Sequence, residues 1–177
     1  GEPRAGTKGN ADQQSTCRTQ SRASVSQALE RIRKVARERK QEKLTALFHH
    51  ISIELLEAAF FELKENAAPG VDRLTWRDYE ADLERNLTDL HDRVRRGAYR
   101  ALPSRRVYIP KADGRQRPIA VAAVEDKIVQ RAVTALLNAI YEEDFLGFSY
   151  GFRPRRSQHD ALDAVVVGIS STKVNYI

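Results

Sequence analysis

Cationic side chains gather within residues 104–118, near the middle of this chain. They are Arg105, Arg106, Lys111, Arg115 and Arg117, and Asp113 is the only acid among them. Guanidinium groups bind phosphates through paired N–H donors, and an ammonium group binds them as a point charge. The segment therefore predicts a phosphate-binding ribbon, and an exposed, merely solvated hairpin is the alternative interpretation.

A second group of cations stands near the C-terminal end. Arg153, Arg155 and Arg156 precede Ser157, which has Asp160 three residues later. This spacing predicts a capped helix start, where free backbone N–H groups beside arginines favour a phosphate. The aromatic run at residues 145–154 is unusual for a simple linker.

A third basic group surrounds a predicted helix that begins at Ser24. Apolar residues recur at helical spacing from Val25 to Ala36, and Arg33, Lys34 and Arg37 lie among them. An amphipathic basic helix can lie on RNA or on an anionic membrane. Because this helix has no large aromatic residue, its composition favours RNA.

The distribution of charge supports a polyanionic partner. The net charge is +6 with a pI of about 9.6. Residues 22–43 carry +5 and residues 93–131 carry +8, whereas residues 44–92 carry −7. The alternative is that these charges serve solubility alone. One cysteine and no long apolar run argue against a disulfide framework and a membrane span, so we expect a soluble, cytoplasmic protein.

These residues need a scaffold of helices and one hairpin. Val107 to Ile109 and Ile119 to Val121 are predicted strands joined by the turn dipeptide Asp113-Gly114. Helices are predicted after Ser52, from Thr75 to Gly97, from Glu125 and after Ser157. Residues 1–22 have the composition of a disordered leader, and residues 173–177 resemble the start of a strand.

Four runs resemble the N-terminal half of group II intron reverse transcriptases, also called maturases. They are Ala-Pro-Gly-Val-Asp (68–72), Arg-Val-Tyr-Ile-Pro-Lys-Ala-Asp-Gly-Arg-Gln-Arg-Pro (106–118), Glu-Asp-Lys-Ile-Val-Gln (125–130) and Tyr-Gly-Phe-Arg-Pro (150–154). The resemblance implies an α+β fold, the mostly helical fingers of a right-hand polymerase with a small antiparallel hairpin. It also implies a helical extension over residues 23–66, fingers over 67–170 and a palm strand beginning at 171–177.

The resemblance also implies roles for single residues. Lys111 and Arg117 resemble the lysine and arginine that meet the nucleotide triphosphate, with Arg106 as a further candidate. Arg153, Arg155, Arg156 and Ser157 resemble the family's contacts to template and primer. Arg105, one of the hairpin cations, is a further candidate for nucleic-acid binding. The family's usual glycine after Val-Asp is here Arg73, which questions the turn because glycine tolerates a positive φ more readily than arginine.

The catalytic aspartates of the family are not found among these residues. We therefore expect an N-terminal piece that lacks the palm and thumb and synthesises no DNA alone, with Mg²⁺ held only in the complete enzyme. Its expected partners are intron RNA, template RNA and deoxynucleotides. An inactive RNA-binding remnant and a basic helical adaptor that binds proteins are the alternatives.

Overall fold

The computed structural model describes residues 9–39 and 47–171, with the backbone alone for residues 9–20. Its elements in chain order are α1 (Gly9–Glu38), the 3-10 helix η1 (Leu47–His50), α2 (Ile53–Phe61), α3 (Trp76–Glu80), α4 (Leu83–Arg95), β1 (Arg105–Pro110), β2 (Gln116–Val121), α5 (Val124–Tyr141) and α6 (Gln158–Ser171). Over the described residues the fold is mostly helical, and its strands form a two-stranded antiparallel sheet. The expected α+β class is confirmed.

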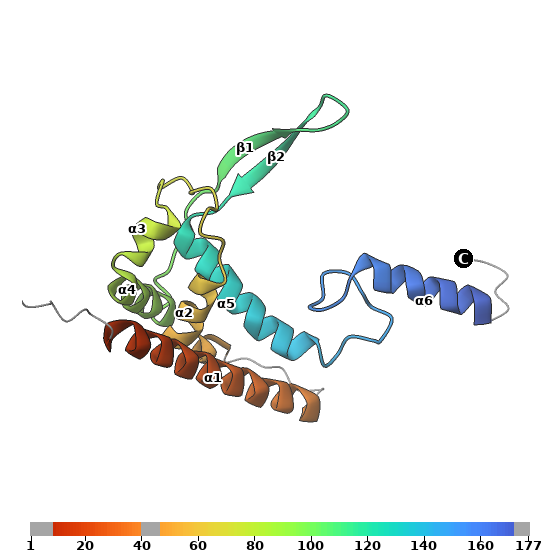
Figure 1. The fold of residues 1–177 in the computed structure, drawn as a ribbon, viewed down its shortest axis with the longest axis horizontal. Helices are drawn as coiled ribbons and strands as arrows, with labels where there is room; N and C mark the ends of the chain where they lie inside the picture. The colour runs from red at the N-terminus through yellow and green to blue at the C-terminus, as the bar shows by residue number, and fades with distance from the viewer. Residues whose placement is uncertain (1–8, 40–46, 172–177) are drawn as a thin grey trace, which may run out of the picture.

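Helix α5 lies at the centre of the helical body, against α1 and α2 (Figure 1). Its residues Ile128, Ala132 and Ala139 are completely buried. From α2, Phe60 stacks on Trp76 with ring centroids 4.6 Å apart, and the Trp76 indole N–H donates to the Phe60 carbonyl at 3.3 Å. Burial of each large apolar side chain contributes about 1.5 to 3 kcal/mol, so this cluster holds the body together.

The caps predicted at Ser52 and Thr75 are present, whereas Ser24 lies inside α1 and caps no helix. One predicted helix is divided into two. Ser52 accepts the Leu55 N–H, and Thr75 and Asp78 form a reciprocal capping box. The helix expected from Thr75 to Gly97 breaks at residues 81–82 into α3 and α4. Asn86 explains the break, because its side-chain amide donates to the Tyr79 carbonyl at 3.0 Å and satisfies an oxygen that a continuous helix would have paired.

The prediction that residues 1–22 form a disordered leader is wrong for residues 9–22. Helix α1 begins at Gly9 rather than after Ser24. No proline or glycine interrupts residues 10–38, so nothing in the sequence stops the helix from extending through its polar N-terminal turns. Residues 1–8, residues 40–46 and the strand expected at residues 173–177 lie outside the described residues.

Two parts of the chain project from the body (Figure 1). The β1–β2 hairpin rises from the N-terminal end of α5, and α6 extends beyond the loop that follows its C-terminal end. None of the α6 side chains is buried, although Leu162, Val165 and Val166 are apolar. The three basic groups of the sequence therefore belong to separate places: the long helix α1, the hairpin, and the loop before α6.

Candidate nucleic-acid interface

The predicted antiparallel hairpin is present, and the structure supplies its register. Residues 105 to 110 pair with residues 121 to 116, and the Lys111 N–H donates to the Arg115 carbonyl at 2.7 Å, which continues the ladder by one pair. Gly114 has φ +80, a value that glycine adopts without strain. Asp113 accepts from the Arg115 backbone and side chain, and this contact lowers the pKa of the Asp113 carboxyl.

This register divides the hairpin cations between two faces. Alternate residues of a strand point to opposite faces, so Lys111 and Arg117 share one face with Ile109. Arg106 belongs to the other face, with Tyr108. Lys111 and Arg117 are diagonal neighbours, roughly 7 to 8 Å apart at Cα, and two long side chains at this separation can meet one polyphosphate.

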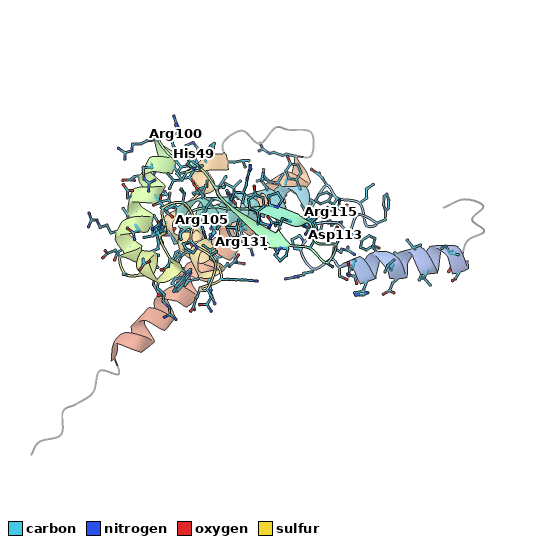
Figure 2. The ribbon with its side chains drawn as sticks, turned by 90° about the horizontal axis from the view of Figure 1, so that it is seen from above. His49, Arg100, Arg105, Asp113, Arg115 and Arg131 are labelled. Carbon is cyan, nitrogen blue, oxygen red and sulfur yellow. The ribbon has the colours of Figure 1, made fainter. Side chains whose placement is uncertain are left out.

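Three cations of the hairpin are free among the residues that the structure describes. Arg106, Lys111 and Arg117 are exposed, and their side chains make no hydrogen bond or ion pair with the residues that the structure describes. Arg115 is paired with Asp113 at 2.7 Å at the tip, where Figure 2 labels both residues. Arg106, Lys111 and Arg117 can therefore bind a phosphate without breaking a contact to another described residue.

Arg105 stands at the base of the hairpin and holds a loop (Figure 2). Its Nε and Nη2 donate to the Pro69 carbonyl at 3.1 and 2.8 Å. From α5, the Lys127 ammonium donates to the Ala68 carbonyl at 2.8 Å, and partial burial lowers the pKa of Lys127. Gly70 completes the junction, because a Cβ there would lie 2.5 Å from the Cα of Ala123.

Two acids at the start of α5 anchor the chain that leads into the hairpin. Glu125 accepts from the Arg93 guanidinium at 2.7 Å and from the Tyr79 hydroxyl at 3.4 Å. Asp126, which is 4% exposed, accepts from the Tyr99 hydroxyl and from the Leu102 N–H. Burial, and then the hydrogen bond to Asp126, raises the pKa of Tyr99.

Sequence reasoning missed this anchoring role. It treated Glu125, Asp126 and Lys127 as the opening of a helix and as part of a run that resembles the family, although each of them holds a different distant segment. The available signal was the run Glu-Asp-Lys itself, because three successive charged residues at the start of an otherwise apolar helix need partners when they are buried.

Arg73 adopts the turn that its residue type disfavours. Its φ is +59, in the left-handed region where the family pattern has glycine. The preceding Asp72 carboxylate accepts from the Leu74 N–H at 3.3 Å and holds the turn. The turn is therefore retained with arginine, at a cost of about 1 to 2 kcal/mol in backbone strain.

Arg153 lies inside the α5–α6 loop instead of projecting from it. Its side chain is 6% exposed and binds both carboxylate oxygens of Glu142, at 2.9 and 3.1 Å. It also donates to the carbonyls of Leu146 and Ser149, and it lies 4.8 Å from the Phe145 ring centroid. Its hydrogen bonds lower the pKa of Glu142. In this structure the loop folds around Arg153.

The neighbours of Arg153 are differently placed. Arg155 is exposed with φ +59, and Arg156 lies 5.6 Å from the Tyr150 ring centroid. Ser157 caps α6, and the Asp160 carboxylate accepts both its N–H, at 2.7 Å, and its hydroxyl. The expected phosphate position at this helix start is thus partly filled by an internal carboxylate.

The three candidate cations of α1 are engaged as well. Arg33 pairs with Glu30 at 3.0 Å, and Lys34 approaches Glu38 at 4.0 Å. Arg37 binds both carboxylate oxygens of Glu143, at 2.9 and 3.1 Å, which joins the end of α1 to the segment after α5. All three remain substantially exposed, so RNA contact would compete with these pairs.

Over residues 21–39 and 47–171, whose side chains the structure describes, no group of three or more His, Cys, Asp or Glu residues is arranged to hold a metal ion. Within residues 9–39 and 47–171 none of the helices is both long enough and apolar enough to span a bilayer.

Comparisons with known proteins find relatives in bacteria and in yeast. The chain is 45% identical over 113 residues to the protein YkfC of Escherichia coli, which covers 63% of this chain and 30% of YkfC. It is 31% identical over 139 residues to the group II intron-encoded protein LtrA of Lactococcus lactis, covering 77% of this chain and 23% of LtrA. An uncharacterized 91 kDa protein in the cob intron of Schizosaccharomyces pombe is 46% identical over 63 residues, 36% of this chain and 8% of that protein.

The matches cover less than a third of the length of these relatives. No family model matches the chain.

Proposed function

This chain is homologous to group II intron-encoded proteins, and from that premise we propose that it is the fingers portion of an RNA-directed DNA polymerase and maturase. In this proposal it binds intron and template RNA and contributes to binding of the incoming deoxynucleotide. The similarity to these relatives supports the family assignment. The free cations of the hairpin support its part in binding the deoxynucleotide.

The observation that carries the proposal is the position of Lys111 and Arg117. They lie on one face of a projecting hairpin, and their side chains have no partner among the described residues. A triphosphate needs neutralisation of several negative charges, which an ammonium group and a guanidinium fork on a common face provide. Because Arg106 lies on the opposite face, we assign the triphosphate to Lys111 and Arg117 only.

The described residues do not fit a two-metal centre. Polymerase chemistry uses two divalent ions that activate the attacking oxygen and stabilise the leaving group. Glu125 and Asp126, the acids nearest to the hairpin base in sequence, are bound to Arg93, Tyr79, Tyr99 and the Leu102 N–H. We therefore assign Mg²⁺ to no residue of this part of the chain.

The nucleotide assignment is tested in a protein that continues this chain through a palm domain. Lys111→Ala and Arg117→Ala should each raise the KM for deoxynucleotide, or lower kcat, because each removes a charge-assisted interaction of about 1.5 to 3 kcal/mol. RNA affinity should stay close to that of the unchanged protein. Arg85→Ala is the matched control, because Arg85 is exposed on α4 away from the hairpin. Loss of RNA affinity with an unchanged nucleotide KM would contradict the assignment.

A further inference from the structure

The second face of the hairpin carries an exposed aromatic ring beside a free cation. Tyr108 and Arg106 are two residues apart on β1, so both belong to the face opposite Lys111 and Arg117. Tyr108 is 53% exposed, and no stacking or cation contact joins its ring to another described residue. Arg106 likewise has no side-chain partner within the described residues.

Two prolines, Pro110 and Pro118, belong to the same face as Tyr108. The Lys111 N–H to Arg115 carbonyl bond marks residues 111 and 115 as a hydrogen-bonded pair, so the Tyr108–Pro118 and Pro110–Gln116 pairs are non-hydrogen-bonded. Side chains of such pairs approach closely, which places Pro118 next to Tyr108. Pro110 and Pro118 have no N–H to offer at the outer edges of the hairpin, which disfavours pairing with a further strand.

We propose that this face binds an unpaired RNA nucleotide, with its base stacked on the Tyr108 ring and its phosphate on Arg106. The two residues are roughly 7 Å apart along the strand, and the long arginine side chain lets them engage one nucleotide. This face combines an exposed ring with a neighbouring cation, in a segment of net charge +8. Such a face complements single-stranded RNA better than it complements an apolar protein surface.

The hairpin then separates its two ligands by face. The triphosphate meets Lys111 and Arg117, and the RNA strand meets Arg106 and Tyr108. The inference rests on the proposed function only in taking RNA as the partner, and its residues are distinct from those assigned to the nucleotide.

The test measures binding of the chain to a single-stranded RNA that contains 2-aminopurine, and to the same RNA in a duplex. Tyr108→Val keeps strand propensity and removes the ring. We expect single-strand affinity to fall roughly tenfold, the quenching of 2-aminopurine to disappear, and duplex affinity to stay unchanged. Tyr108→Phe should behave as the unchanged chain. Arg106→Gln should lower the slope of log K against log salt by about 0.7.

Matched controls distinguish this site from general effects. Tyr141→Val removes a ring of similar exposure, 52%, at the end of α5 and should alter none of these quantities. Equal losses for single strand and duplex, or unchanged affinity of Tyr108→Val, would overturn the inference while RNA binding by the chain itself still stands. Loss of self-association in Tyr108→Val without any change in RNA affinity would instead assign the face to a protein contact. Failure of the unchanged chain to bind any RNA would remove the proposed function as well.

Discussion

At the scale of single residues, several side chains hold backbone conformations that their types disfavour. Arg73, Phe152 and Arg155 have φ values of 57 to 59 within the described part of the chain. Phe152 is also fully exposed. Such conformations persist where neighbouring contacts fix the backbone. For Arg73, that contact is the hydrogen bond from the Leu74 N–H to the Asp72 carboxylate.

Replacing Arg73 should therefore stabilise the protein. Arg73→Gly relieves about 1 to 2 kcal/mol of left-handed strain, and the greater freedom of glycine in the unfolded chain offsets about 0.5 to 1 kcal/mol of that gain. We expect a net increase of about 0.5 kcal/mol in the free energy of unfolding, measured by urea denaturation. Arg77→Gly, at an exposed helical position of α3, is the control and should be destabilising. A destabilised Arg73→Gly variant would show that the arginine side chain makes a favourable contact that outweighs its strain.

At the scale of elements, the hairpin is positioned by a junction of three segments. Arg105 from β1 and Lys127 from α5 hold two successive carbonyls of the residue 68–72 loop. Gly70 allows the same loop to touch the backbone at Ala123. The orientation of the hairpin on the body therefore depends on contacts between segments that are far apart in the sequence.

Gly70→Ala should disturb this junction. Its Cβ would lie 2.5 Å from the Ala123 Cα and 2.6 Å from its nitrogen, and backbone cannot give way as a flexible side chain can. Overpacking of this kind costs about 1 to 3 kcal/mol, measurable as a lower free energy of unfolding. Gly147→Ala is the matched control, because nothing lies within 4 Å of its added Cβ. Equal stability of the two variants would contradict the close packing of Gly70.

The α5–α6 loop should respond to acid through Glu142. Arg153 lowers the pKa of Glu142 in the folded protein below its ordinary value of about 4.3. The Glu142–Arg153 pair therefore contributes its full stability above that ordinary value, and the contribution is lost as the pH falls through the lower folded pKa. Over that window the protection factors of the amides in residues 146–153, which compare each observed exchange rate with the intrinsic rate at the same pH, should fall.

An Arg153→Gln variant provides the comparison for this acid effect. Without the guanidinium, the protection factors of the loop amides should be low at every pH and should no longer depend on the ionisation of Glu142. A loop that stays equally protected in both proteins down to pH 3 would show that other contacts hold it.

At the scale of the whole molecule, opposite charges occupy different regions. Residues 93–131 carry +8 and include the hairpin, whereas residues 44–92 carry −7 and include α2, α3 and most of α4. A polyanion is attracted to the first region and repelled by the second, which would orient the chain on the proposed RNA partner before any close contact forms.

RNA affinity should accordingly fall steeply with salt, and its slope should depend on where a cation is removed. Combined replacement of Arg106, Arg155 and Arg156 by Gln should lower the slope for structured RNA by up to about 0.9 for each phosphate that is no longer neutralised. Combined replacement of Arg77 and Arg85, which lie within the acidic region, should leave the slope nearly unchanged. Binding that is indifferent to salt between about 50 and 200 mM would contradict a phosphate-based interface.

Local patterns determined much of this protein by themselves. The turn dipeptide and flanking strands of the hairpin, the Ser52, Thr75 and Ser157 caps and the apolar face of α5 all depend on residues a few positions apart, and the structure has each of them. The question raised by Arg73 was likewise visible in the sequence, and the structure answers it with a positive φ. Local sequence also misled at Asp82, where the side chain of Asn86 interrupts the helix, and in residues 9–22, where a polar composition forms a helix.

The tertiary structure alone decided which cations are free. In the sequence, Arg105, Arg153 and Arg37 are cations in basic segments just as Lys111 and Arg117 are. In the structure, however, Arg105 binds the Pro69 carbonyl, Arg153 binds Glu142 and Arg37 binds Glu143. Arg106 is likewise separated from Lys111 and Arg117 only by the strand register. A charge pattern counts cations without their partners, and those partners are 11 to 106 residues away in the chain. Only folding brings such distant groups together, so only the folded structure distinguishes an arginine that builds the protein from one that remains available to bind RNA.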